Sequence, residues 1–201
     1  MAATDPTAEK TDEELAREAR AGSRRSFEEL ACRYRRRLFV YLRPRLGSDE
    51  DAEDMVQDTF LKIYRSIDRY DPAYRFSTWL YTSAHRLAID SFRKNAVARD
   101  GVPASSGQDV PDPAAGCEGE AGATGVWDTA RTLGAARFRV LWLRYGEDMT
   151  IEEIAAVLGR TRLAVRVLLH RARAALIERV GPGTGRVKAL EPGVAGGTAG
   201  K

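Results

Sequence analysis

The chain has 201 residues, of which 43% are aliphatic or aromatic and 30% are charged. This composition is typical of one large or two small globular domains, and it excludes collagen-like, mucin-like and wholly disordered chains. No run approaches the roughly 18 apolar residues of a membrane span, and the first residues lack a basic region followed by an apolar one, so we expect a cytoplasmic protein without a secretory signal.

Charge is distributed unevenly along the chain, although the net charge is only +3. Residues 96–130 contain one basic and six acidic side chains, whereas residues 131–179 contain ten basic and five acidic ones. All ten of those basic residues are arginine. Because arginine forms forked hydrogen bonds to phosphates and bases, the distal block favours contact with nucleic acid.

Residues 11–95 carry apolar side chains at the three- and four-residue steps that predict amphipathic helices. Helix ends are indicated by two capping boxes and a glycine stop, formed by Thr11 with Glu14, Ser26 with Glu29, and Gly47 before Ser48. We expect helices near residues 12–21, 26–45, 49–67 and 77–95. No stretch alternates long enough to predict a strand, so the expected fold class is all-α.

Residues 96–127 are rich in Pro, Gly, Ser and Ala and hold few large apolar side chains. We interpret them as a flexible acidic linker, because such a segment cannot bury enough surface to fold. Residues 181–201 are rich in Gly and basic, and they are expected to form a disordered tail.

Residues 128–180 are predicted to form a second small helical domain. Thr150 and Glu153 fit another capping box, and Gly159 precedes a helix near residues 162–179. Two helices joined by a short glycine-containing turn, the second rich in arginine, predict a helix-turn-helix.

The sequence contains few of the residues and motifs that catalysis or metal binding requires. The only histidines are His85 and His170, and Cys32 and Cys117 are not spaced as a zinc pair. Neither a glycine-rich phosphate loop nor a recognisable catalytic set is present. We therefore expect a protein that is not an enzyme, with no cofactor, no metal and two free thiols.

Four blocks of the sequence resemble one bacterial family. They are DAEDMVQDTFLKIY (51–64), RFSTWLYTSAHRLAIDSFRK (75–94), LRYGEDMTIEEIAAVLGR (143–160) and LHRARAAL (169–176). In this order they resemble RNA polymerase sigma factors of the extracytoplasmic-function (ECF) type of the sigma-70 family.

The resemblance implies a non-catalytic subunit that directs core RNA polymerase to specific promoters. Residues 11–95 would be sigma region 2, which binds core polymerase and the minus-ten element. Residues 128–180 would be region 4, which binds the minus-thirty-five element. An anti-sigma protein is implied as a further partner.

Four residues of the first block share one helical face, at steps of three and four: Asp54, Gln57, Asp58 and Leu61. Such a polar stripe suits docking against other helices, and the alternative is an ordinary solvated acidic surface. With the resemblance, we predict that these four residues and Phe60 bind core polymerase. The carboxylates lack the glycine and spacing of a calcium loop, so no cation is expected there.

Aromatic and basic side chains crowd together between residues 69 and 94. Aromatic faces stack on unpaired bases while cations hold phosphates, although some of these rings must belong to the core, Trp79 in part. The residues predicted to bind the minus-ten strand are Tyr74, Arg75, Phe76, Trp79, His85, Arg86, Arg93 and Lys94. Family members often carry Asn where this chain has Arg86.

The distal helix has an unusual exposed face. Its inward face is predicted to consist of Val165, Leu169, Ala172 and Leu176, which step by four, three and four. That leaves Val167 and Leu168 where relatives have polar groups. This pair could contact thymine methyl groups or pack against a protein partner. The residues predicted to bind the minus-thirty-five element are Arg162, Arg166, His170, Arg171 and Arg173.

Three further interpretations stay open. The acidic linker could mimic RNA in the polymerase channel through Asp109, Asp112, Glu118 and Glu120, or simply be well solvated. The chain could be a free-standing helix-turn-helix regulator that binds duplex promoter DNA without polymerase. It could also be a helical interaction protein that grips a partner through Val167 and Leu168.

Overall fold

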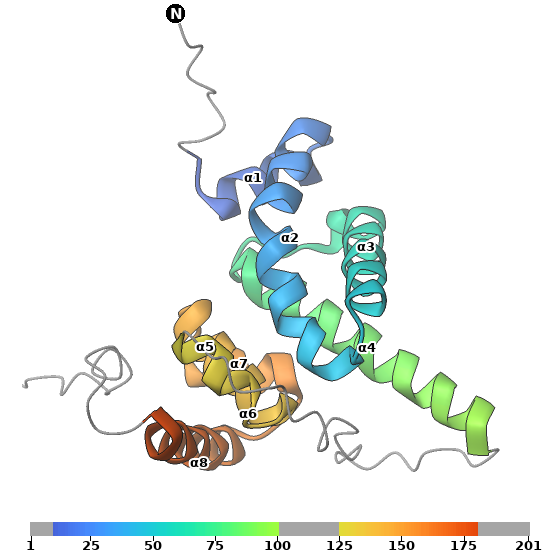
Figure 1. The fold of residues 1–201 in the computed structure, drawn as a ribbon. Helices are drawn as coiled ribbons and strands as arrows, with labels where there is room; N and C mark the ends of the chain where they lie inside the picture. Colours follow the sequence, from blue (N-terminus) through green and yellow to red (C-terminus); the bar gives the residue numbers. More distant parts are fainter. Residues whose placement is uncertain (1–9, 101–124, 181–201) are drawn as a thin grey trace, which may run out of the picture.

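Figure 1 presents the computed structural model, which describes residues 10–100 and 125–180. The predicted tail and most of the predicted linker, with its four acidic residues and Cys117, lie outside the described residues. The described residues form helices and turns without a strand, which confirms the all-α expectation. The elements are α1 (Asp12–Arg20), α2 (Arg24–Leu46), α3 (Asp49–Arg65), η1 (Ile67–Arg69), α4 (Phe76–Asp100), α5 (Val126–Arg131), α6 (Ala135–Leu141), η2 (Trp142–Gly146), α7 (Ile151–Leu158) and α8 (Arg162–Val180).

The N-terminal helical unit, α1–α4, is built around the long helix α2, which packs against α1, α3 and α4 (Figure 1). Its core contains fully buried side chains from all four helices, among them Leu15, Leu30, Ile63 and Leu80. Buried apolar side chains recur at three- and four-residue steps along these helices, so burial of one apolar face accounts for each helix.

One predicted helix start was wrong. The N-cap of α2 is Ser23, whose side chain accepts a hydrogen bond from the Ser26 amide at 3.3 Å. The Ser26 hydroxyl instead donates to Glu18 at 2.6 Å. Gly22, with φ of 101°, turns the chain just before Ser23, so the helix starts earlier than the capping-box pattern indicated.

Two boundaries of the predicted linker also differ from the structure. Helix α4 continues to Asp100, five residues beyond the expected end, because residues 96–99 (Ala-Val-Ala-Arg) contain no helix breaker before Gly101. Helix α5 begins at Val126, two residues before the expected start of the second domain.

The C-terminal helical unit, α5–α8, places α7 and α8 as a helix-turn-helix. Gly159 adopts a left-handed conformation with φ of 62° and ends α7, and the Thr161 hydroxyl then accepts from the Ala164 amide at 3.2 Å to start α8. The predicted inward face is confirmed: the buried residues of α8 are Val165, Leu169, Ala172 and Leu176.

The two helical units are in contact. Helix α7 packs against α4, and α6 also approaches α2. In Figure 1 α8 lies on the side of its unit away from α4. The exposed face of α8 is therefore accessible, whereas part of α7 is covered by α4.

His85 is a buried residue of α4 and gives a pH-dependent prediction. It is 7% exposed, and its Nδ1 lies 3.2 Å from the Tyr41 hydroxyl. Burial lowers the pKa of His85 to about 3, with Arg139 and Arg45 acting in the same direction. The folded protein therefore keeps the ring neutral, while the unfolded chain takes up a proton near pH 6.5.

The free energy of unfolding should consequently fall as pH drops from 6.5 toward 3, by up to about 1.4 kcal/mol per pH unit from this group. Urea titrations at pH 7 and pH 5 on the native chain and a His85→Gln variant measure this contribution. The variant should lose less stability between the two pH values, and an equal loss in both proteins would contradict the assignment.

Candidate functional site

The exposed face of α3 carries the four residues predicted to share it. Asp54, Gln57, Asp58 and Leu61 are all exposed, and the Leu61 side chain is 51% accessible. Met55, Val56, Thr59 and Ile63 are buried on the opposite side and fix the orientation of the helix. The structure thus presents an acidic and polar stripe that ends in an apolar side chain.

Phe60 does not belong to that exposed stripe. It is half-buried and makes an edge contact with Phe27, at 6.4 Å between ring centroids. Tyr64 is 50% exposed and its ring lies 4.9 Å from that of Phe27. Tyr64 therefore replaces Phe60 at the surface, and its position three residues after Leu61 was the signal that could have found it. We call Asp54, Gln57, Asp58, Leu61 and Tyr64 the α3 surface.

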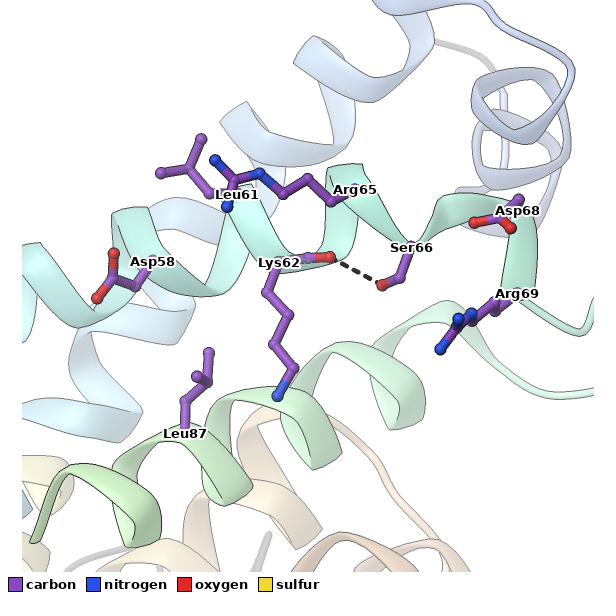
Figure 2. Close-up of a pocket in the computed structure, with 8 residues that line it drawn as sticks. All are labelled: Asp58, Leu61, Lys62, Arg65, Ser66, Asp68, Arg69 and Leu87. Carbon is purple, nitrogen blue, oxygen red and sulfur yellow. Dashed lines mark hydrogen bonds between the residues drawn. The ribbon is translucent and has the colours of Figure 1, made fainter. Parts of the chain in front are cut away.

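A shallow groove of about 490 Å³ lies beside this surface, between the end of α3 and α4 (Figure 2). At the edge of the groove, the Ser66 hydroxyl donates to the Lys62 carbonyl at 2.8 Å and closes the last turn of α3. The groove is lined by three cations, two carboxylates, two leucines and one serine: Asp58, Leu61, Lys62, Arg65, Ser66, Asp68, Arg69 and Leu87. Sequence reasoning had assigned only Asp58 and Leu61 from this set to a binding surface.

The loop before α4 holds Tyr74 in an exposed position. Tyr74 is 66% exposed, and its carbonyl accepts a 2.8 Å hydrogen bond from the buried Tyr70 hydroxyl. The Asp71 side chain accepts from the Ala73 amide at 3.0 Å, as in an Asx turn. These bonds fix the loop while leaving the Tyr74 ring open to solvent.

Phe76 and His85 do not lie on the same surface as Tyr74. Phe76 is completely buried and packs edge-on against Tyr70 and Trp79, with ring centroids 5.9 Å and 6.1 Å away. Phe76 and His85 are core residues, so the prediction that they contact DNA was wrong. Trp79 is half-buried in the same cluster, in keeping with a partly structural role.

Three cations of the predicted minus-ten set, Arg86, Arg93 and Lys94, are exposed on α4. Arg75 is exposed as well, but its guanidinium donates to the Asp148 carbonyl at 3.0 Å and lies 3.8 Å from the Glu153 carboxylate. Both partners belong to the C-terminal unit. The contact between the units therefore occupies Arg75 and leaves the other three cations accessible.

Glu147 forms the buried centre of the contact between the units. Its side chain is fully buried, and an Arg37 guanidinium nitrogen lies 2.7 Å from a carboxylate oxygen. Tyr81 is hydrogen-bonded to the carboxylate and also accepts a 3.4 Å bond from the Trp142 indole. Burial raises the pKa of Glu147, although Tyr81 and Arg37 act in the opposite direction.

Sequence reasoning missed this ion pair. Its partners are 110 residues apart, and Glu147 stands in a Gly-Glu-Asp turn that resembles a solvated loop. A buried carboxylate with a distant partner leaves no periodic signal in the sequence.

The exposed face of α8 carries most of the predicted minus-thirty-five residues. Arg166, His170 and Arg171 are exposed, and the exposed Arg162 lies 3.6 Å from Glu152. Arg173 differs, because its guanidinium hydrogen-bonds the Tyr145 hydroxyl and sits 5.4 Å from the centre of that ring. Arg173 therefore helps to pack the unit.

The apolar part of this face is not the pair that the sequence indicated. Val167 is 42% exposed, whereas Leu168 is half-buried against the core. Leu163 is 70% exposed and lies one turn before Val167. The exposed apolar pair in the N-terminal part of α8 is consequently Leu163 and Val167, and Ile177 is exposed near the other end of the helix.

Within residues 10–100 and 125–180, no group of three or more His, Cys, Asp or Glu side chains could hold a metal ion. No helix among these residues is long and apolar enough to cross a membrane.

Family models match both helical units. The model for Sigma-70 region 2 matches residues 30–97, and the model for Sigma-70, region 4, matches residues 126–176.

Similar proteins span almost the same length. RNA polymerase sigma factor CarQ of Myxococcus xanthus is 31% identical over 169 residues, which cover 81% of this chain and 93% of that protein. The ECF RNA polymerase sigma-E factor of Salmonella typhimurium is 28% identical over 187 residues, covering 86% and 95%. The structure of CnrH in complex with the cytosolic domain of CnrY matches with a TM-score of 0.57 and 27% identity, over 86% of this chain and 99% of CnrH. The chain therefore belongs to the ECF group of the sigma-70 family of RNA polymerase sigma factors.

Proposed function

We propose that the chain directs core RNA polymerase to promoters by dividing three contacts among three exposed surfaces. The observation that carries this assignment is the chemistry of those surfaces: a polar and acidic one on α3, an aromatic and basic one before and along α4, and an arginine-rich one on α8. They occur in the order in which the family arranges its regions. The polymerase supplies the chemistry, and the chain acts in the cytoplasm as a non-catalytic subunit without a cofactor.

The α3 surface binds core polymerase in this proposal. Asp54, Gln57 and Asp58 offer hydrogen-bond and ion-pair partners, while Leu61 and Tyr64 offer apolar area that is otherwise left in water. An interface that pairs a few apolar anchors with polar neighbours is the arrangement expected for specific protein association.

The Tyr74 loop and the exposed cations of α4 capture the minus-ten strand. The Tyr74 ring can stack on an unpaired base, and Arg86, Arg93 and Lys94 can hold phosphates along the strand. The mixed-charge groove of Figure 2 continues this surface toward α3 through Arg65 and the other residues that line it. Arg75 joins the DNA-binding surface once the contact with Asp148 and Glu153 opens.

Helix α8 enters the duplex at the minus-thirty-five element. Arg162, Arg166, His170 and Arg171 are exposed on it, and the second helix of a helix-turn-helix is the one that lies in the major groove. An anti-sigma protein is proposed as the regulating partner. CnrH was solved with the cytosolic domain of CnrY, and RpoE of Bartonella quintana, which shares the fold, was solved with the anti-sigma factor NepR.

Removing the Tyr74 ring tests the minus-ten assignment. A Tyr74→Ala variant should lower the affinity of the polymerase complex for a fork-junction promoter fragment roughly 5- to 150-fold, the range for one base–aromatic stack. Tyr74→Phe is the matched control and should stay near the native affinity, because stacking needs the ring and not the hydroxyl group. Equal behaviour of the Ala and native proteins would contradict the assignment.

A further inference from the structure

The recognition helix α8 presents apolar side chains at its most exposed N-terminal positions. Leu163 and Val167 are 70% and 42% exposed, and the buried face formed by Val165 and Leu169 fixes the outward direction of both. They lie one helical turn apart, which separates them by about 6 Å along the axis. Exposure of these apolar side chains to water costs free energy unless a binding partner covers them.

The surroundings of this pair are basic. Arg162 and Arg166 alternate with Leu163 and Val167 along the helix, and all four are exposed. The only acidic residue in α8 is Glu178, near its C-terminal end, and among the described residues the one acidic contact of these arginines is Glu152 of α7, 3.6 Å from Arg162. This charge pattern is complementary to a polyanion and favours duplex DNA as the occupant.

Apolar side chains have one specific partner in the major groove. Among the base edges there, only thymine carries a methyl group, and Ala, Thr and Phe side chains use it for recognition. The N-terminal residues of a recognition helix are the ones that reach base edges. A spacing of about 6 Å corresponds to nearly two base-pair steps of about 3.4 Å.

We propose that Leu163 and Val167 are specificity-determining residues that contact the methyl groups of thymines in the minus-thirty-five element, one or two base pairs apart, while Arg162 and Arg166 hold the flanking phosphates. This inference rests on the proposed binding of α8 to that element. It gives α8 a preference for thymine through apolar side chains, at helix positions that have no polar side chain to read the bases.

A third exposed apolar residue on α8 distinguishes DNA binding from the binding of a protein partner. Ile177 is 47% exposed and lies ten residues after Val167, about 15 Å farther along the axis. A partner helix lying along α8 would cover Ile177 together with Val167. DNA read by the N-terminal part of the helix would not reach Ile177.

The test uses the full chain bound to core polymerase and a promoter fragment selected by that complex from genomic DNA. Deoxyuridine replaces thymine at one upstream position at a time, which removes only a methyl group from the base. Each contacted methyl should be worth about fourfold in affinity. Val167→Ala and Leu163→Ala should each weaken binding to the thymine promoter, and each variant should become indifferent to deoxyuridine at one position. Both positions are exposed and helical, so alanine leaves the fold intact.

Ile177→Ala is the matched control and should bind as the native chain does. If the loss of affinity caused by Val167→Ala simply adds to the loss caused by every deoxyuridine substitution, Val167 contacts none of the tested methyl groups, and the proposed contact is overturned. A loss that Val167→Ala and Ile177→Ala share, regardless of deoxyuridine, would overturn it in favour of a protein partner on α8. If Arg166→Ala and replacement of the whole upstream element also change nothing, the proposed role of α8 itself fails, and this inference with it.

Discussion

A double substitution on the α3 surface, Asp54→Ala/Gln57→Ala, should weaken binding of the chain to core RNA polymerase by roughly 30- to 900-fold. Each side chain is exposed on one face of α3, and truncating polar residues at the centre of an interface costs about 1 to 2 kcal/mol apiece. Because neither side chain supports the core, the melting temperature of the free chain should not change. Fluorescence anisotropy of labelled chain titrated with core polymerase measures the affinity.

The control variant removes two exposed side chains four residues apart on α2, Glu28→Ala/Cys32→Ala. It should bind core polymerase with native affinity. If both double variants bind equally well, the α3 surface is not the polymerase contact, and an unrelated exposed surface must be sought.

Arg37→Ala should separate the two helical units. Removing the guanidinium leaves the Glu147 carboxylate buried without its cation, which typically costs about 3 to 5 kcal/mol for a fully buried pair. Since the Arg37 side chain is 39% exposed and solvent screens part of the interaction, we expect roughly 2 to 3 kcal/mol against the docked arrangement. Energy transfer between dyes on Cys32 and a Glu178→Cys position, in a Cys117→Ser background, measures the docking.

Arg24→Ala provides the comparison for that experiment. Arg24 also lies on α2 and pairs with a glutamate, Glu28, at 2.8 Å, but the two side chains are 80% and 60% exposed. Its loss should leave energy transfer unchanged. Undiminished transfer in the Arg37→Ala protein would contradict a stabilising role for the buried pair.

Opening of the units has a consequence for promoter binding. A folded body of the described size has a radius of gyration of about 15 Å. The two promoter elements lie roughly 25 base pairs apart, or about 85 Å at 3.4 Å per step. If the two units bind the two elements as proposed, the docked arrangement cannot reach both, and Arg37→Ala should bind promoters with polymerase at least as tightly as the native chain.

Local sequence signals predicted the helices and the buried face of α8 well. Val165, Leu169, Ala172 and Leu176 obey the helical period, and burial of one helix face depends only on residues within that helix. The exposure of Asp54 and Gln57 followed from the same rule. Composition placed the end of α4 five residues too early and the start of the second unit two residues too late.

Contacts between distant segments could not be predicted in this way. Whether the ring of Phe76 or His85 faces solvent depends on what α2 and α7 place beside α4, and a local period cannot report that. Leu168 was predicted to be exposed but is half-buried for a similar reason, because it packs against the core of the C-terminal unit. The Arg37–Glu147 pair joins α2 to the turn before α7 and exists only once both units are folded.

The most direct test of the central claim is run-off transcription on pooled genomic fragments by core polymerase, with and without this chain. We expect discrete transcripts that require the chain and disappear with the Asp54→Ala/Gln57→Ala variant, while the Glu28→Ala/Cys32→Ala variant retains them. A chain that binds core polymerase but yields no transcripts from any fragment would contradict a promoter-directing role.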